Sequence, residues 1–271
     1  MAYTKIIGDL GVKGNAAQGD IVWDGSTALA KDVFANNITI QAGATINTGG
    51  FRLFAKNRIT IEGVLTRQGN PAQGLTGGVA VSANTCSGGT AGGNAGTVGN
   101  IGSNSTAQAI GMGGKGGNGG AGTFAAGTAG AVTGPNAANG STLLPNTLAF
   151  VLWDKTAPHQ NPIAAASGGG GGGGGVAQDG GGGGGGAGTI VIGCRTLLGS
   201  GTITAKGGSG DNGTGDSGGG GGGGGGMVFI SAQKVSSSLT IDVSGGDPGT
   251  PGAGTGATGS FGTTGVIIRL A

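Results

Sequence analysis

Residues 190–208, which read IVIGCRTLLGSGTITAKGG, are the stretch that decides the fold. Residues 228–246, VFISAQKVSSSLTIDVSGG, align with them without a gap 38 residues later, and residues 52–70, RLFAKNRITIEGVLTRQGN, also align without a gap, with Asn70 in place of the last glycine. In each copy an apolar strand is followed by a turn and a second, alternating strand. One such repeat cannot bury its apolar side alone, so we expect neighbouring copies to stack or pair.

Short apolar segments also follow the last copy and run through the first 70 residues, where the copy at 52–70 contains two of them. Residues 265–270, GVIIRL, look like the first strand of another copy. In the first 70 residues, five short segments are separated by Gly, Asn and Asp, namely residues 21–23, 37–40, 44–47, 52–54 and 58–61. Their spacing of about seven residues leaves no room for helices. The sequence therefore predicts an all-β fold in which short strands form β-solenoid or sandwich repeats.

Three uninterrupted glycine runs lie between the repeats, and their first and last residues are Gly168 and Gly175, Gly180 and Gly186, and Gly218 and Gly226. Ordering one residue costs about 1–2 kcal/mol, and a buried backbone hydrogen bond returns only about 0.5–1.5 kcal/mol, so an isolated run must be disordered. Runs that lie side by side as extended threefold helices can approach closely, and the strands that directly follow the second and third runs can anchor them. We therefore predict packed polyglycine II-type helices, with these glycines as structural residues.

The overall composition supports an ordered chain and its division into parts. The chain has 271 residues, 74 of them Gly and only seven Pro, and the glycine runs lack the third-residue period of collagen. Hydrophobic residues make up 35%, which is unlike a disordered chain. We expect an N-terminal β-solenoid-like part at 1–70, with a role in attachment, a Gly/Ala/Ser/Thr-rich insert at 71–163 with an apolar segment at 143–153, and a polyglycine and strand repeat region at 164–271.

Charge and hydropathy exclude several partners. The net charge is +2 and Lys and Arg are not clustered, so no nucleic-acid partner is expected. No run reaches the roughly 18 apolar residues of a membrane span, and the first residues, MAYTK, have no apolar region of a secretory signal. Cys86 and Cys194 are expected to be buried thiols, with a bridge between them left open.

No enzymatic activity, metal or cofactor is expected. Lys115, in GGKG at 113–116, lacks the hydroxyl residue of a phosphate-binding loop. His159 is the only histidine, which excludes a multi-histidine metal site and argues against Ser-His or Cys-His nucleophiles. The aspartates that could act in glycoside cleavage are Asp154, Asp179, Asp211, Asp216 and Asp247. Most of them lie in turn-like contexts, where Asp caps its own backbone, and calcium binding stays open although the EF-hand spacing is missing.

The apolar segment and the residues after it are the best candidate for contact with a partner. Phe150, Trp153, Pro158 and His159 gather there in a chain that has two Trp and one Tyr. One interpretation is an exposed aromatic platform for a sugar or a protein. The other is a core plug or a subunit interface, because a long apolar stretch is costly to leave in water.

Polyglycine followed by Ile-Val-Ile at 180–192, and GTITAKGG at 201–208, resemble glycine-rich bacteriophage virion proteins. The nearest family is the polyglycine-sandwich tail-fibre adhesins of T-even-like phages, and the resemblance covers about residues 165–271. It implies a sandwich of polyglycine helices whose intervening variable loops contact the bacterial receptor. The first 70 residues do not resemble that family's fibre-attachment domain.

The leading expectation for function is therefore a non-enzymatic virion surface protein, a receptor-binding adhesin at a tail-fibre tip. It would be extracellular after host lysis, and its expected partners are fibre or capsid proteins, a bacterial outer-surface protein or glycan, and further copies of itself. The first alternative is a capsid-decorating or head-fibre protein, and the second is an extracellular filament or ice-binding protein.

Overall fold

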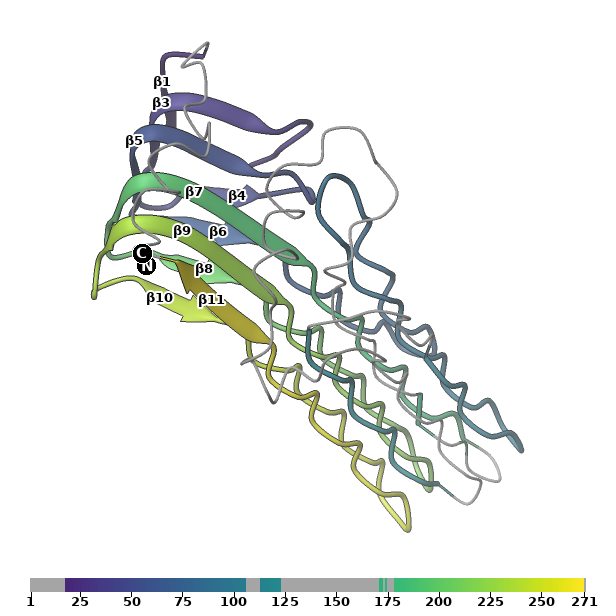
Figure 1. Ribbon diagram of the computed structural model, residues 1–271. Coiled ribbons are helices and arrows are strands. Elements are labelled where there is room, and N and C mark those ends of the chain that lie inside the picture. Colours follow the sequence, from purple (N-terminus) through teal and green to yellow (C-terminus); the bar gives the residue numbers. More distant parts are fainter. Residues whose placement is uncertain (1–17, 106–112, 123–170, 173, 175–177, 271) are drawn as a thin grey trace, which may run out of the picture.

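The computed structural model describes residues 18–105, 113–122, 171–172, 174 and 178–270. These residues form strands, turns and extended segments, and none of them is helical. Figure 1 shows two sheets at one end of the molecule and long, narrow chain segments that leave the sheets side by side toward the other end. The predicted all-β class is confirmed for the described residues.

Within the described residues, eleven strands form two sheets in which every neighbouring pair is parallel. Sheet A has the order β1 (Asp20–Trp23), β3 (Val33–Ile40), β5 (Leu53–Ile61), β7 (Thr189–Leu198), β9 (Met227–Val235) and β11 (Val266–Leu270). Sheet B has the order β10 (Thr240–Asp242), β8 (Thr202–Thr204), β6 (Val64–Thr66), β4 (Thr45–Asn47) and β2 (Thr27–Ala28). The chain therefore visits the two sheets alternately.

The sequence repeat appears in the structure as strand register. Ile190 of β7 pairs with Val228 of β9, which is the 38-residue offset of the sequence alignment. Strand β11 pairs with β9, so the prediction that the chain ends in the first strand of another copy is confirmed.

Strand β5 corrects two of the sequence expectations. Residues 52–54 and 58–61 were expected as separate strands, but β5 runs through both segments. Arg58 pairs with Thr196 as the gapless alignment requires, whereas Leu53 pairs with Ile192, one position away from the alignment. The gapless alignment of residues 52–70 with 190–208 therefore gives the wrong pairing for the part of β5 before the bulge. The bulge lies between Phe54 and Arg58 and takes up one extra residue of β5 without breaking the strand.

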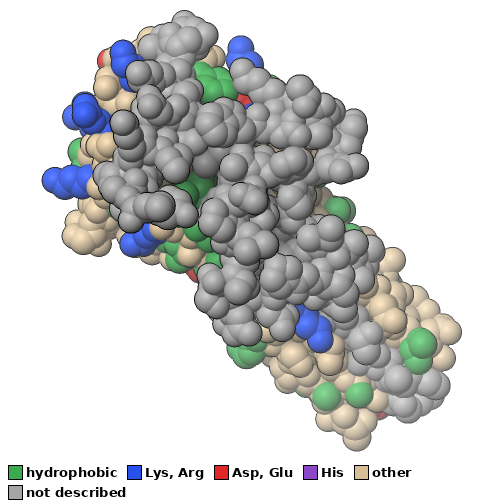
Figure 2. Space-filling model, in the orientation of Figure 1, with side chains coloured by type: hydrophobic (Ala, Val, Ile, Leu, Met, Phe, Trp, Pro, Cys, Tyr) green, Lys and Arg blue, Asp and Glu red, His purple; other side chains and the backbone are tan. Residues whose placement is uncertain are grey.

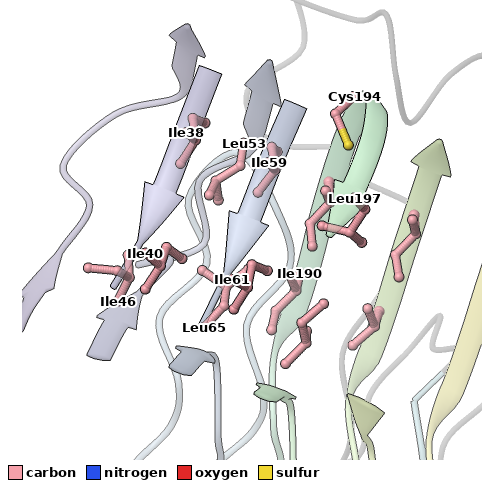
Figure 3. Close-up of a cluster of buried hydrophobic side chains, with 14 of the residues drawn as sticks. Ile38, Ile40, Ile46, Leu53, Ile59, Ile61, Leu65, Ile190, Cys194 and Leu197 are labelled. Carbon is pink, nitrogen blue, oxygen red and sulfur yellow. The ribbon is translucent and has the colours of Figure 1, made fainter. Parts of the chain in front are cut away.

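The main core lies between the two sheets. Figure 3 shows Ile38, Ile59 and Leu197 from successive strands of sheet A beside Ile46 and Leu65 from sheet B. All five side chains are fully buried. A smaller cluster on the opposite face of sheet A contains Phe54, Cys86, Val191 and Phe229. Burial on both faces is typical of parallel sheets and explains the continuous apolar runs of β7 and β9.

Both cysteines are free and buried, as the sequence analysis expected. Burial raises the pKa of Cys86 and of Cys194 to about 12, from an ordinary value of 9.0. We expect neither thiol to react with a chromogenic disulfide reagent at about pH 8 until the protein is unfolded. Because unfolded thiols ionise first, the free energy of unfolding should fall as the pH rises from 9.0 toward about 12 and be insensitive to these thiols below that range. Immediate reaction of both thiols in the folded protein would contradict this burial.

Candidate functional site

The segments that run beside one another beyond the sheets are here called the glycine bundle; they are residues 67–105, 113–122, 178–188, 205–226 and 243–265. The run at 218–226 lies inside it and is hydrogen-bonded in steps of three residues. The amides of Gly219, Gly222 and Gly225 donate to the carbonyls of Ala257, Ser260 and Thr263 at 3.1, 3.0 and 2.9 Å. The amides of Gly220, Gly223 and Gly226 donate to Asp211, Gly208 and Ala205 at 2.9, 2.8 and 2.8 Å.

The carbonyls of the same run accept from further neighbours. Gly218, Gly221 and Gly224 accept from Gly181, Gly184 and Ala187 at 3.0, 2.8 and 3.1 Å. Gly219, Gly222 and Gly225 accept from Gly120, Gly117 and Gly114 at 2.7, 2.7 and 2.6 Å. Chain segments therefore surround this run on several sides, and one of them is the preceding glycine run, residues 180–186.

This surrounding explains why the inner run contains nothing but glycine. At each of the nine positions 218–226, an added Cβ would lie closer than 3.0 Å to a backbone carbonyl of a neighbouring segment. The outer segment at 256–265 is surrounded less completely, by the inner run and by the segments at 115–121 and 243–249. There Gly256, Gly259, Gly262 and Gly265 face the inner run, and the residues between them are exposed.

The segments of the bundle reverse direction at the end far from the sheets, as Figure 1 shows. We call this end the loop tip and define it as residues 97–100, 178–179, 211–216 and 250–255. Gly99, Gly215 and Gly254 have φ values of 75°, 51° and 125° at three of the turns. Glycine adopts this left-handed region without a Cβ penalty, so each reversal can be tight.

Hydrogen bonds join the loops of the tip to one another. Asp179 Oδ1 accepts from the amide of Val98 at 2.8 Å, and the Asp179 carbonyl accepts from Ser217 Oγ at 2.6 Å. Asn212 Oδ1 accepts from the amide and the hydroxyl of Thr250 at 2.8 and 3.0 Å. The loops are therefore positioned by one another as well as by the bundle.

The aspartates of the tip mostly bond the backbone of other loops, and only Asp211 also accepts from an adjacent amide, as local capping of a turn would require. Asp216 Oδ1 accepts from the amide of Thr255 at 3.2 Å, and Asp211 accepts from the amides of Gly74 and Asn212 at 2.6 and 2.8 Å. Asp247 instead pairs with Lys206 at 2.8 Å. Across the described residues, no three His, Cys, Asp or Glu side chains gather closely enough to hold a metal ion.

The structure places only some of the predicted site residues. Phe150, Trp153, Pro158 and His159 lie outside the described residues, as do Gly168, Gly175 and Asp154. Two buried glycine runs of the bundle begin and end at predicted structural residues, namely Gly180 and Gly186, and Gly218 and Gly226. Lys115 is exposed on an outer segment, beside Gly114 and Gly117.

The sequence analysis missed the outer segments as partners of the runs. Their signal was a glycine at every third position, seen in Gly207, Gly210 and Gly213 and again from Gly256 to Gly265. An added Cβ at Gly207 or Gly210 would meet Gly223 or Gly220 of the inner run. A third-residue glycine period outside collagen therefore accompanies a segment that packs against the inner run.

The surface differs between the two ends of the molecule. On the face drawn in Figure 2, Lys and Arg side chains lie mainly over the sheets. The loop tip contains no Lys or Arg, and its charged residues are Asp179, Asp211 and Asp216. At that end Val98 and, just beyond the tip, Ile101 are 48% and 65% exposed. The tip thus offers amide, carboxylate and hydroxyl groups beside exposed aliphatic side chains.

Comparison of the chain with protein families, with curated proteins and with solved structures yields no match. No helix in the described residues has the length and apolar character required to cross a bilayer.

Proposed function

We propose that the chain is a non-enzymatic surface protein of a bacteriophage virion, and that it acts as a receptor-binding adhesin at a tail-fibre tip. The loop tip would contact a protein or glycan on the bacterial outer surface, and the sheet end would face other virion proteins. The observation that carries this proposal is the meeting of several loops, hydrogen-bonded to one another, at the far end of a glycine framework. Binding residues are commonly found on loops that a rigid scaffold positions.

The finer architecture belongs to the same proposal. Strands that alternate between two parallel sheets with a 38-residue register support a β-solenoid. Hydrogen bonds that recur every third residue, such as those from Gly219, Gly222 and Gly225, support threefold polyglycine II-type helices. In this architecture the solenoid anchors one end of each helix and the loops close the other.

The chemistry of the tip suits a polar ligand with apolar patches. Asn100, Asn212 and Thr214 are exposed there and carry hydrogen-bonding side chains that sugar hydroxyl groups or peptide groups could meet. Val98 adds an aliphatic contact beside them. Because the framework holds the loops in place, little conformational entropy would be lost on binding.

Cell binding tests the proposal. Purified protein should coat bacteria of a strain on which the phage forms plaques, and it should block infection. Val98→Glu should weaken cell binding about tenfold or more, because it puts a charge into the contact surface. Val79→Glu is the matched control, since Val79 is 63% exposed away from the tip, and it should bind like the natural protein.

The other functions predict different results. Absence of cell binding, together with many copies per particle, would replace the adhesin with capsid decoration. Thermal hysteresis in cold solution would instead support ice binding. Equal coating by natural protein and Val98→Glu would remove the loop tip from the contact.

A further inference from the structure

Both ends of sheet A carry half-length strands. At one end, β11 pairs with Met227–Ser231 of β9, and the rest of β9, residues 232–235, pairs with β7 but has no strand on its outer side among the described residues. At the other end, β1 pairs with residues 37–40 of β3. Residues 33–35 of β3 pair with β5 but have no strand on their outer side in the described part of the chain, where the side chain of Gln18 accepts from the amide of Phe34 at 3.0 Å. The two gaps lie in opposite halves of the strands.

The register shows that these halves are complementary. Across sheet A, Asn37 of β3 lies at the same level as Lys234 of β9, because the two are connected by the successive strand pairings of Asn37 with Arg58, Arg58 with Thr196 and Thr196 with Lys234. Asp20 of β1 pairs with Asn37 and therefore also lies at this level. If β1 of a second copy continued the sheet beyond β9, its Asp20 would lie beside Lys234. Leu270 of β11 lies opposite Ser231, so only the positions opposite Ala232 and Gln233 would separate β11 from the incoming β1.

We propose that copies of this chain associate head to tail. In this arrangement β11 of the first copy and β1 of the second copy lie end to end, and together they form one strand between β9 of the first copy and β3 of the second. In the same register, Val33 and Phe34 of the second copy would lie beside Arg269 and Leu270. Each half-strand would then gain the neighbour that it lacks. The proposal does not depend on the adhesin function.

Charge at the joint is complementary. Lys234 is exposed on the outer face of β9. Asp20 is exposed, and its Oδ1 accepts from the side-chain amides of Asn36 and Asn37 at 2.8 and 2.9 Å. These hydrogen bonds lower the pKa of Asp20, so its carboxylate is ionised near neutral pH.

Apolar groups and backbone groups are also open at these edges. Ile267 is 40% exposed, and Val235 and Ile241 are only partly buried at this end of the core. Ile21 and Trp23 are partly buried at the opposite end. Repeat stacks normally cover such ends with polar caps, so two open ends favour contact between them.

The edge of β11 is prepared for another parallel strand. The amide of Val266 donates to Gly226 at 3.1 Å, on the β9 side. Because backbone groups alternate along a strand, those of Ile267 and Arg269 point away from β9. An edge of this kind is a template for pairing with another chain. A head-to-tail contact leaves one edge of each copy free, and successive strands of a straight stack add without closing a ring, so repeated addition should build an open stack.

Charge reversal tests the joint. Natural protein should grow with concentration in steps of its 25.0 kDa mass in analytical ultracentrifugation or mass photometry. Asp20→Lys alone and Lys234→Asp alone should each weaken association about tenfold or more, because like charges would meet at the joint. A mixture of the two variants should associate again, since every joint between unlike copies pairs opposite charges. Lys56→Asp, an exposed change on the inner strand β5, is the matched control and should associate normally.

A second variant tests the strand edge separately. Arg269→Pro removes one amide that points away from β9 and leaves the ladder to β9 intact, so the protein should stay folded and lose association. Natural protein that remains at 25.0 kDa at every concentration would overturn the proposal. Growth that stops at two copies, or a charge-reversed mixture that does not associate, would overturn it too.

Discussion

Gly222→Ala is expected to lower the free energy of unfolding by about 3 kcal/mol, and the melting temperature by roughly 6–12 °C. Gly222 lies in the inner run, and an added Cβ would lie closer than 3.0 Å to the carbonyl oxygen of Gly246. The obstacle is backbone on a neighbouring segment, which cannot rotate away as a side chain would. Chemical denaturation and calorimetry measure the effect.

Gly25→Ala is the matched control for this substitution. Nothing lies within 4 Å of an added Cβ at Gly25, and its φ is not in the left-handed region. The same chemical change there should alter stability by less than about 0.5 kcal/mol. Equal melting temperatures for the two variants would mean that the inner run is not packed as described.

Amide hydrogen exchange should differ about a thousandfold between neighbouring residues of the outer segment at 256–265. The amides of Gly259, Ser260 and Gly262 donate to Gly249, Asn118 and Gly246 at 3.1, 2.7 and 3.1 Å, so they should exchange slowly. The exposed amides of Thr258 and Phe261 have no hydrogen-bond partner among the described residues and should exchange fast. Nuclear magnetic resonance on dilute protein, below any association, resolves the individual residues.

The inner run extends this test. Gly219, Gly220, Gly222 and Gly223 all donate hydrogen bonds and are buried, so their amides should be protected at least as well as that of Ser260. Uniformly fast exchange along 218–226 would show a flexible run. It would also remove the rigid support on which the proposed adhesin depends.

Much of the strand arrangement could be read from the sequence. The offset between residues 190–208 and 228–246 became the register of β7 and β9, because apolar residues with a period of two must face the same core in every copy. The bulge in β5 could not be predicted in this way. One extra residue in a strand leaves the apolar pattern on either side almost unchanged, so only the observed pairing of Leu53 with Ile192 reveals it.

The candidate site was less predictable than the strands. Local context predicted that Asp179, Asp211 and Asp216 cap their own turns, but only Asp211 accepts from an adjacent amide, and the other carboxylate bonds of these residues reach distant loops. That Asp179 would meet Val98 could not be foreseen, since residues 98 and 179 are brought together only by the packing of the bundle. The predicted contact residues from Phe150 to His159 stay a prediction, because they lie outside the described residues.

By itself, the sequence determined where strands form and which segments can lie closely packed, since apolar alternation and the absence of a Cβ are local properties. Only the tertiary structure decided which segments are neighbours, which loops meet at the tip and which half-strands remain open at the ends of sheet A. The physical reason is that glycine has no side chain with which to specify a partner. An inner glycine such as Gly222 accepts any backbone that the anchoring strands bring within hydrogen-bonding distance.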